Sequence, residues 1–241
     1  MRQHVNPLSR FYQAPRALPP LPDLFPNPDL PLHLDIGSAR GRFLLALAPL
    51  RPDPHHLGLE IRRPLAQAAE ADQQAAQLAN LRFLFTNASV NLPDWLAQLP
   101  PGRLDLVTLQ FPDPWFKARH HKRRVLQPPL LRALTAAMAP GSQLFLQSDV
   151  LPLIEPMVAL VEASGCFARP AADPQPWRPS NPLPVPSERE RHVEAQGLPV
   201  YRVLFLRNFQ PPPPLDALEG PAEAAQAGAT HTPGQSPVEV L

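Results

Sequence analysis

The chain has 241 residues, a hydrophobic content of 44% and one cysteine, which suffices for one α/β domain with extensions and excludes an intramolecular disulfide and a cysteine-based zinc site. Residues 208–241 contain four carboxylates and no Lys or Arg, so they carry −4 and leave +5 for the rest of a chain whose net charge is +1. We expect a polyanionic partner and no membrane, because no apolar run reaches the roughly 18 residues of a bilayer span. Without a secretory h-region, a cytoplasmic location is expected.

Short apolar runs alternate with amphipathic stretches between residues 31 and 150. Strands are predicted over 32–37, 55–61, 81–88, 104–110 and 142–149, and helices over 41–50, 64–78, 91–99, 125–138 and 151–165, with Pro128 and Pro129 delaying the start of the fourth helix. This order is typical of an α/β fold with a doubly wound, mainly parallel sheet. A last strand over 198–209, antiparallel to the others, completes the prediction, with a short partner near Cys166.

Three regions follow from the composition. Residues 1–30 form a basic, Pro-rich arm, residues 31–209 the folded domain, and residues 210–241 an acidic Pro/Ala-rich tail. Few aromatic residues and many prolines in the tail predict disorder. No feature indicates an obligate protein partner.

A polar residue lies at the end of each of the five predicted strands. In a parallel sheet, ligands bind beyond the carboxyl ends of the strands, so these side chains mark a candidate site. They are Asp35 with Gly37, Glu60, Asn87, Asp113 and Asp149.

Three of these strand ends have alternative interpretations. The turn DIGSARG lacks the dinucleotide pattern G-x-G-x-x-G, because Ala39 occupies the middle position, and an ordinary strand–helix turn fits equally well. Glu60 is placed to accept hydrogen bonds from ribose hydroxyls, or to pair with Arg62 or Arg63 as a solvated acid. Asn87 is placed to bind an adenine edge, or to cap a short helix.

The run FPDPWFKARHHKRRVLQ, residues 111–127, is the most informative segment. Asp113 lies between two prolines, which keep its backbone extended just past a strand. A dense cationic block follows and favours phosphate contacts, with a solvated charge run as the alternative. Its candidate RNA-binding residues are Lys117, Arg119, His120, Lys122, Arg123 and Arg124. No metal site is predicted, because the adjacent His120 and His121 point in different directions.

Taken together, DIGSARG, GLEI, TNA, FPDPWFKARHHKRR and QSD resemble the bacterial tRNA (guanine-N(7)-)-methyltransferases, which have the Rossmann-like class I methyltransferase fold. The resemblance spans about residues 34–206, and its long Asp-Pro-Trp and basic block is the specific part. It implies S-adenosyl-L-methionine as cofactor, tRNA as partner, and N7 of a guanosine in the variable loop, position 46, as target. The cofactor-binding residues that it implies are Asp35, Gly37, Glu60, Asn87 and Asp113.

The resemblance also assigns the remaining site residues. Asp113 becomes the catalytic residue, and substrate binding falls to Lys117, Asp149 and the run Ser187, Glu188, Arg189 and Glu190, which stands where the family has Thr-x-x-Glu. Departures from the family pattern are Asp35 in place of Glu, Phe116 in place of His, Val150 in place of Trp and Ser187 in place of Thr.

Three other functions stay open on the sequence. A Rossmann dehydrogenase is disfavoured by the glycine spacing. An inactive RNA-binding protein on the methyltransferase fold is disfavoured by the intact Asp35, Glu60, Asn87 and Asp113. A methyltransferase for another nucleic acid position is the third, although amino methylation favours Asn/Asp-Pro-Pro-aromatic and this chain has Pro-Asp-Pro-Trp.

Overall fold

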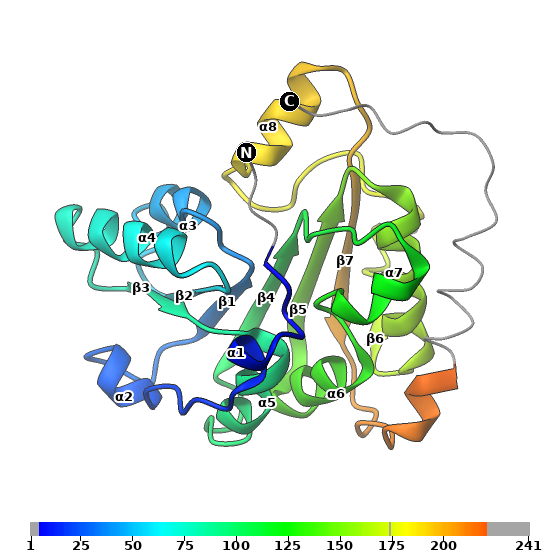
Figure 1. Cartoon of the computed structure of the whole chain (residues 1–241), viewed down its shortest axis with the longest axis horizontal. Helices are drawn as coiled ribbons and strands as arrows, with labels where there is room; N and C mark the ends of the chain where they lie inside the picture. The colour runs from blue at the N-terminus through cyan, green and yellow to red at the C-terminus, as the bar shows by residue number, and fades with distance from the viewer. Residues whose placement is uncertain (1–4, 174, 221–241) are drawn as a thin grey trace.

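The computed structural model describes residues 5–173 and 175–220, which form an α/β fold around a seven-stranded sheet with helices on both faces (Figure 1). The strand order is β3-β2-β1-β4-β5-β7-β6. Strands β1 to β5 are mutually parallel, whereas β7 is antiparallel to β5 and β6, so the predicted fold class is confirmed. The strands are β1 (Leu32–Ile36), β2 (His55–Glu60), β3 (Leu81–Phe85), β4 (Leu104–Gln110), β5 (Met138–Ser148), β6 (Phe167–Ala168) and β7 (Tyr201–Arg207).

The helices fill the connections between parallel strands, as a doubly wound sheet requires. Two short helices precede the sheet, and a 3₁₀ helix, η1 (Ala118–Arg123), follows β4. The α-helices are α1 (Arg10–Gln13), α2 (Leu21–Leu24), α3 (Arg42–Leu47), α4 (Arg63–Ala75), α5 (Ala88–Leu96), α6 (Pro128–Ala137), α7 (Leu151–Ala163) and α8 (Glu188–Ala195). Among the described residues, no helix combines the length and apolar composition that crossing a bilayer requires.

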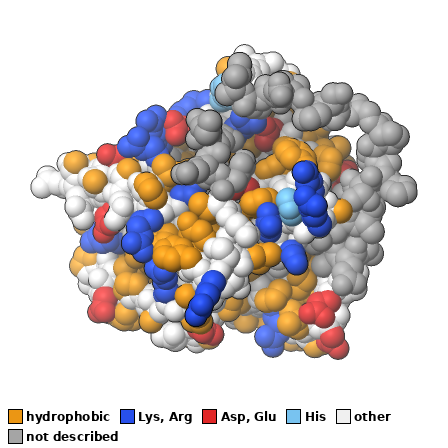
Figure 2. Space-filling view, in the orientation of Figure 1, with side chains coloured by type: hydrophobic (Ala, Val, Ile, Leu, Met, Phe, Trp, Pro, Cys, Tyr) orange, Lys and Arg blue, Asp and Glu red, His pale blue; other side chains and the backbone are white. Residues whose placement is uncertain are grey.

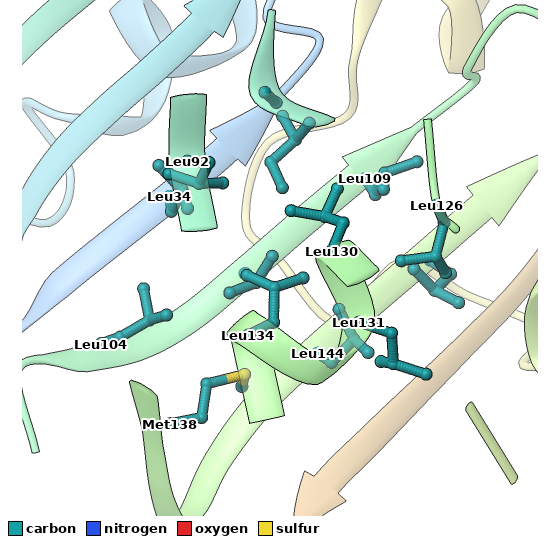
Figure 3. Close-up of a cluster of buried hydrophobic side chains, with 14 of the residues drawn as sticks. Leu34, Leu92, Leu104, Leu109, Leu126, Leu130, Leu131, Leu134, Met138 and Leu144 are labelled. Carbon is teal, nitrogen blue, oxygen red and sulfur yellow. The ribbon is translucent and has the colours of Figure 1, made fainter. Parts of the chain in front are cut away.

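One face of the sheet carries a leucine-rich core. Leu34 of β1, Leu109 of β4 and Leu144 of β5 pack with Leu92 of α5 and with the leucines of α6 (Figure 3). Each such side chain is essentially inaccessible to solvent and contributes about 2 kcal/mol through burial. Because side chains alternate along a strand, the residues between these leucines project to the opposite face. On β1 those residues are His33 and Asp35, both buried.

The start of α6 differs from the prediction. Pro128 and Pro129 do not delay the helix but occupy its first turn, N1 and N2, where the N–H groups that proline lacks have no partner within the helix. The fixed φ of proline also suits this position, so the helix begins at Pro128.

Both terminal regions pack more closely than expected. In the predicted arm, Leu21, Leu24 and Phe25 are buried in the leucine-rich core, and the indole Nε1 of Trp95 donates to the Pro19 carbonyl at 2.7 Å. The arm is therefore part of the domain. In the predicted disordered tail, residues 216–220 are helical and Leu218 is fully buried, because its apolar side chain fills the same core. The rest of the tail, residues 221–241, lies outside the described residues.

Candidate active site

The predicted site residues gather at one edge of the sheet. Asp35 is the penultimate residue of β1 and Glu60 the last of β2. Asn87, Asp113 and Asp149 follow β3, β4 and β5, respectively, within three residues of the strand end. Because these five strands are parallel, their carboxyl ends share an edge, and the sequence prediction of a common location is confirmed.

Asp35 is a buried carboxyl at the centre of this edge. Its Oδ1 forms a hydrogen bond of 2.6 Å with the hydroxyl of Thr108, and Gln110 also bonds to it. Burial raises the pKa of Asp35 to about 6, against the lowering effect of these two hydrogen bonds, and the charge of Glu60 raises it further. Asp35 thus takes up a proton at a higher pH than an ordinary aspartate does.

The turn after β1 has room for a ligand beside its backbone. Gly37 has φ +90°, and a Cβ built there meets nothing within 4 Å. The neighbouring hydroxyl, Ser38 Oγ, is buried without a hydrogen-bond partner among the described residues. A buried hydroxyl without a partner costs free energy, and open space with a vacant donor suits a polar ligand. Gly41 ends the turn at φ +71°, where a Cβ would overlap the ring of Phe83.

Glu60 is buried and already engaged by four donors. Its Oε1 accepts from the backbone N and the Nε of Arg62, both at 2.8 Å, and its Oε2 accepts from the Ala39 N at 2.9 Å and from the Arg62 Nη2 at 3.3 Å. Pairing with Arg62, one of the two interpretations of the sequence, is confirmed, although the carboxylate is buried rather than solvated.

Arg62 responds to two carboxylates at once. Burial works against its charge, but Glu60 and then Asp113 outweigh that effect and raise the pKa of the Arg62 guanidinium. Arg62 therefore links the end of β2 electrostatically to the loop after β4.

Asn87 caps α5, as the second interpretation of the sequence predicted. Its Oδ1 accepts from the Ser89 N at 3.2 Å. Its Nδ2 donates to the carbonyls of Pro7 and Tyr12 at 3.2 and 3.1 Å, so the N-terminal segment lies over the end of β3. Phe11 stacks there on Phe85, with ring centroids 6.3 Å apart. An adenine contact by Asn87 stays a prediction.

The loop that carries Asp113 is strained on both sides. Phe111 and Trp115 have φ of +48° and +44°, a left-handed conformation that bulky L-residues rarely adopt. Such strain costs of the order of 1–3 kcal/mol per residue and persists where surrounding contacts enforce it, often at functional sites. Here the Phe111 N donates to the Gln147 carbonyl at 2.8 Å, and the Arg124 Nε donates to the Pro114 carbonyl at 3.0 Å.

The cationic block separates into exposed and structural members. Lys117, Arg119 and Lys122 are exposed, and Arg123 lies over the Trp115 ring with its Cζ 4.9 Å from the centroid. The face in Figure 2 shows Lys and Arg side chains gathered around an apolar patch. Arg124, predicted to bind RNA, is only 6% exposed and donates to the Pro114 carbonyl of the loop. The prediction is therefore corrected, because this side chain stabilises the loop instead of facing solvent.

The run Ser187–Glu190 forms the first turn of α8. Ser187 Oγ accepts from the Glu190 N, and the Glu190 carboxylate accepts from the Ser187 N, which makes a capping box. Glu190 is buried and also binds Gln147, Asn181 and Arg202. The capping box is therefore structural, and substrate contacts by Ser187 and Glu190 stay predictions.

Two ion pairs tie the same turn to the site. Arg189 pairs with Asp149 at the end of β5, and Glu188 pairs with Arg42 at the start of α3 at 2.6 Å. These contacts bring the predicted substrate residues Asp149, Glu188 and Arg189 to the edge that carries Asp35.

The sequence analysis missed the polar residues beneath the site. They are His33, His56, Thr108, Gln110 and Gln147, all with side chains on the face opposite the leucine-rich core. The signal was present in β4, where Thr108 and Gln110 are two residues apart, so that both face the same side; the other polar residue of this strand, Asp105, is near its start.

Comparison with known proteins gives consistent results. Residues 29–203 match a family model described as a putative methyltransferase. The tRNA (guanine-N(7)-)-methyltransferases of Synechococcus sp. strains CC9311 and WH7803 are 64% and 62% identical to this chain, each over 219 residues that cover 91% of this chain and 92% of the relative. Among solved structures, the 16S rRNA methyltransferase KamB has a TM-score of 0.52 at 15% identity, with a match that covers 74% of this chain and 88% of KamB, which supports the fold alone.

Proposed function

We infer the function of this chain from the family to which it belongs, the tRNA (guanine-N(7)-)-methyltransferases: it transfers a methyl group from S-adenosylmethionine to N7 of a guanosine in tRNA. The observation that carries this inference is identity above 60% over nearly the full length of the relatives. The gathering of Asp35, Glu60, Asn87, Asp113 and Asp149 at one sheet edge supports it, because ligands of such folds bind there.

The residues present fit the cofactor. We propose that Asp35, Gly37, Glu60, Asn87 and Asp113 hold it, with the vacant Ser38 hydroxyl and the open space beside Gly37 as further support. When bound, S-adenosylmethionine supplies the electrophilic methyl group. A carboxylate has about four acceptor positions, and all four of Glu60 are taken. Glu60 therefore binds ribose hydroxyls after the Arg62 guanidinium turns away, while its two backbone donors remain.

The acceptor chemistry needs positioning more than proton removal. Guanine N7 has an in-plane lone pair and no proton, so no strong general base is required. The protein has to hold N7 at near-attack distance, and the purine gains a positive charge as it is methylated. We propose that Asp113, which lies in the strained loop, and Asp149 stabilise that charge or accept hydrogen bonds from the guanine N1–H and amino group.

The exposed cations beside Asp113 provide the surface for tRNA. Lys117, Arg119 and Lys122 project to solvent, and we propose that they and Arg123 contact phosphates, with His120 against the Trp115 ring. Phosphate contacts position an RNA without reading its sequence. We propose that Asp113, Asp149 and the first turn of α8 contact the base and so select the variable-loop guanosine, position 46.

The deciding experiment is transfer of labelled methyl from S-adenosylmethionine to an unmodified tRNA transcript, followed by borohydride/aniline cleavage. Cleavage at a variable-loop guanosine, lost in Asp113→Ala, is the expected result. Label without cleavage would reject N7 and favour methylation at another position. No label, with retained binding of S-adenosylhomocysteine, would favour an RNA-binding protein on the methyltransferase fold. Thermal stabilisation by NAD instead of S-adenosylhomocysteine would indicate a dehydrogenase.

A further inference from the structure

A chain of buried hydrogen bonds runs beneath the site and ends on Asp35. The His56 Nε2 lies 3.1 Å from the Arg51 carbonyl, and the His56 Nδ1 lies 3.0 Å from the His33 Nδ1. The His33 Nε2 lies 2.9 Å from the Thr108 Oγ1, which in turn lies 2.6 Å from the Asp35 Oδ1. His33, His56 and Thr108 are each at most 2% exposed, so bulk solvent does not reach them. The proposed mechanism uses none of these three residues.

This series of hydrogen bonds lacks one proton when Asp35 is ionised. Four hydrogen bonds need four protons. Two neutral imidazoles and one hydroxyl supply three, one each. The first group, the Arg51 carbonyl, can only accept, and an ionised Asp35 can also only accept. With an ionised Asp35, one of the four contacts therefore joins two acceptors. All four bonds are satisfied when Asp35 is a carboxylic acid that donates to Thr108, with Thr108 donating to His33, His33 to His56 and His56 to Arg51.

We propose that His33, through Thr108, is a positioning residue that favours a proton on Asp35 in the cofactor-free protein at mildly acidic pH, and that this proton leaves when S-adenosylmethionine binds. The second half rests on the proposed function. In the bound state the cofactor, with a net positive charge, favours the ionised carboxylate, so its affinity becomes coupled to proton release.

The surrounding groups place the extra proton on Asp35 rather than on an imidazole. Asp35 faces Glu60 from β2 as well as Thr108 and Gln110 from β4, and its pKa is raised to about 6, mainly by burial. His56 faces Arg51 and His55, and burial first, with the charges of these neighbours, lowers its pKa to about 4. Burial, His56 and Arg51 lower the pKa of His33 well below its ordinary value. Both histidines are therefore neutral at pH 7.

The first test reads the tautomers in the cofactor-free protein by NMR of ¹⁵N-labelled histidine at about pH 5, which lies below the pKa of Asp35 and above that of His56. The expected result is a neutral His33 with its proton on Nδ1 and a neutral His56 with its proton on Nε2. A proton on the Nε2 of His33 would reverse or break the chain and overturn the proposal. This measurement needs neither cofactor nor turnover, so its failure is distinct from failure of the proposed function.

The second test counts protons released on binding of S-adenosylmethionine without tRNA, by calorimetry in buffers of different ionisation enthalpy. With a pKa of about 6, wild type releases roughly half a proton at pH 6. In His33→Phe, Thr108 can donate to an ionised Asp35 without conflict, so release falls. In Thr108→Val, the ionised form loses a donor and release rises. The control is His55→Gln, next to His56 on β2. His55 contacts the Asn27 carbonyl and is not part of the series of hydrogen bonds, so this variant leaves proton release unchanged.

Proton release is expected to fall in His33→Phe and to rise in Thr108→Val. If the two residues only packed the core, both variants would change proton release in the same direction. Equal release in wild type and His33→Phe would overturn the proposal. If wild type does not bind S-adenosylmethionine at all, the proposed function fails, and the NMR tautomers still decide the proton count.

Discussion

Replacing Arg62 by Gln tests whether the buried ion pair with Glu60 competes with cofactor. The variant removes two of the four donors on the Glu60 carboxylate, at 2.8 and 3.3 Å, and keeps the backbone N–H groups of Arg62 and Ala39. The Glu60 side chain is 3% exposed and that of Arg62 is 26% exposed, so the burial of this ion pair is intermediate between that of a surface pair and that of a fully buried pair. Its loss should cost the cofactor-free protein about 2 kcal/mol, between the ranges for those two cases.

The cofactor-bound protein should lose much less, because ribose hydroxyls replace the guanidinium on Glu60. The variant should therefore melt about 4–8 °C lower without ligand. It should bind S-adenosylhomocysteine more tightly than wild type, by up to about tenfold when roughly 1.4 kcal/mol of the difference is recovered. Differential scanning fluorimetry and isothermal calorimetry measure the two effects. The control is Arg63→Gln, since the Arg63 guanidinium lies over the Phe85 ring at 4.7 Å rather than on Glu60. Weaker binding at an unchanged melting temperature would refute the argument and make Arg62 a cofactor ligand.

The same geometry predicts the outcome of further substitutions. Asp113→Asn should lower kcat for methyl transfer by about 100-fold in single-turnover assays, because it removes the charge facing the cationic purine. Lys117→Ala should raise the KM for tRNA and reduce the salt slope of binding by about one, whereas Arg124→Ala should lower the melting temperature, because Arg124 is buried against the Pro114 carbonyl. Ser187→Ala should cost about 1 kcal/mol in urea unfolding through loss of the capping box. The raised pKa of Asp35 means that the folded state binds the proton more tightly than the unfolded state does. This group therefore lowers the free energy of unfolding as pH rises from about 4 to 6. Asp35→Asn should reduce that pH dependence in urea unfolding.

The sheet and its carboxyl edge were predictable because the apolar runs of the strands and the amphipathic pattern of the helices are both strong in this sequence. Buried parallel strands such as LDLVTLQ give short apolar runs, and the polar residue after each run marks the carboxyl edge. The arm was harder to interpret, because Pro19, Pro20 and Pro22 suggest an irregular segment. The apolar spacing of Leu21, Leu24 and Phe25 nevertheless buries that segment in the core.

The contacts of the site residues could not be predicted, because they depend on segments distant in sequence. The Asn87 side chain reaches carbonyls 75 and 80 residues away, and Arg62, which is near Glu60 in sequence, also interacts electrostatically with Asp113. In the sequence, His33 is one of two polar residues in the short strand LHLDI, and nothing nearby indicates a partner for its side chain. Its function as a hydrogen-bonding group becomes visible only when the register places it beside His56 of β2.

The S-x-x-E run at Ser187 shows how one pattern carries two kinds of information. As a local signal it is a capping box, and it does start α8. The same turn places Arg189 on Asp149 and Glu188 on Arg42, which fixes α8 against the carboxyl edge of the sheet. Glu190 then joins the buried Gln147 to Arg202 of β7, so the antiparallel end of the sheet supports the same turn. The helix cap is compatible with the proposed substrate contacts of this turn, because the cap uses Ser187 and Glu190 while Glu188 and Arg189 pair with Arg42 and Asp149.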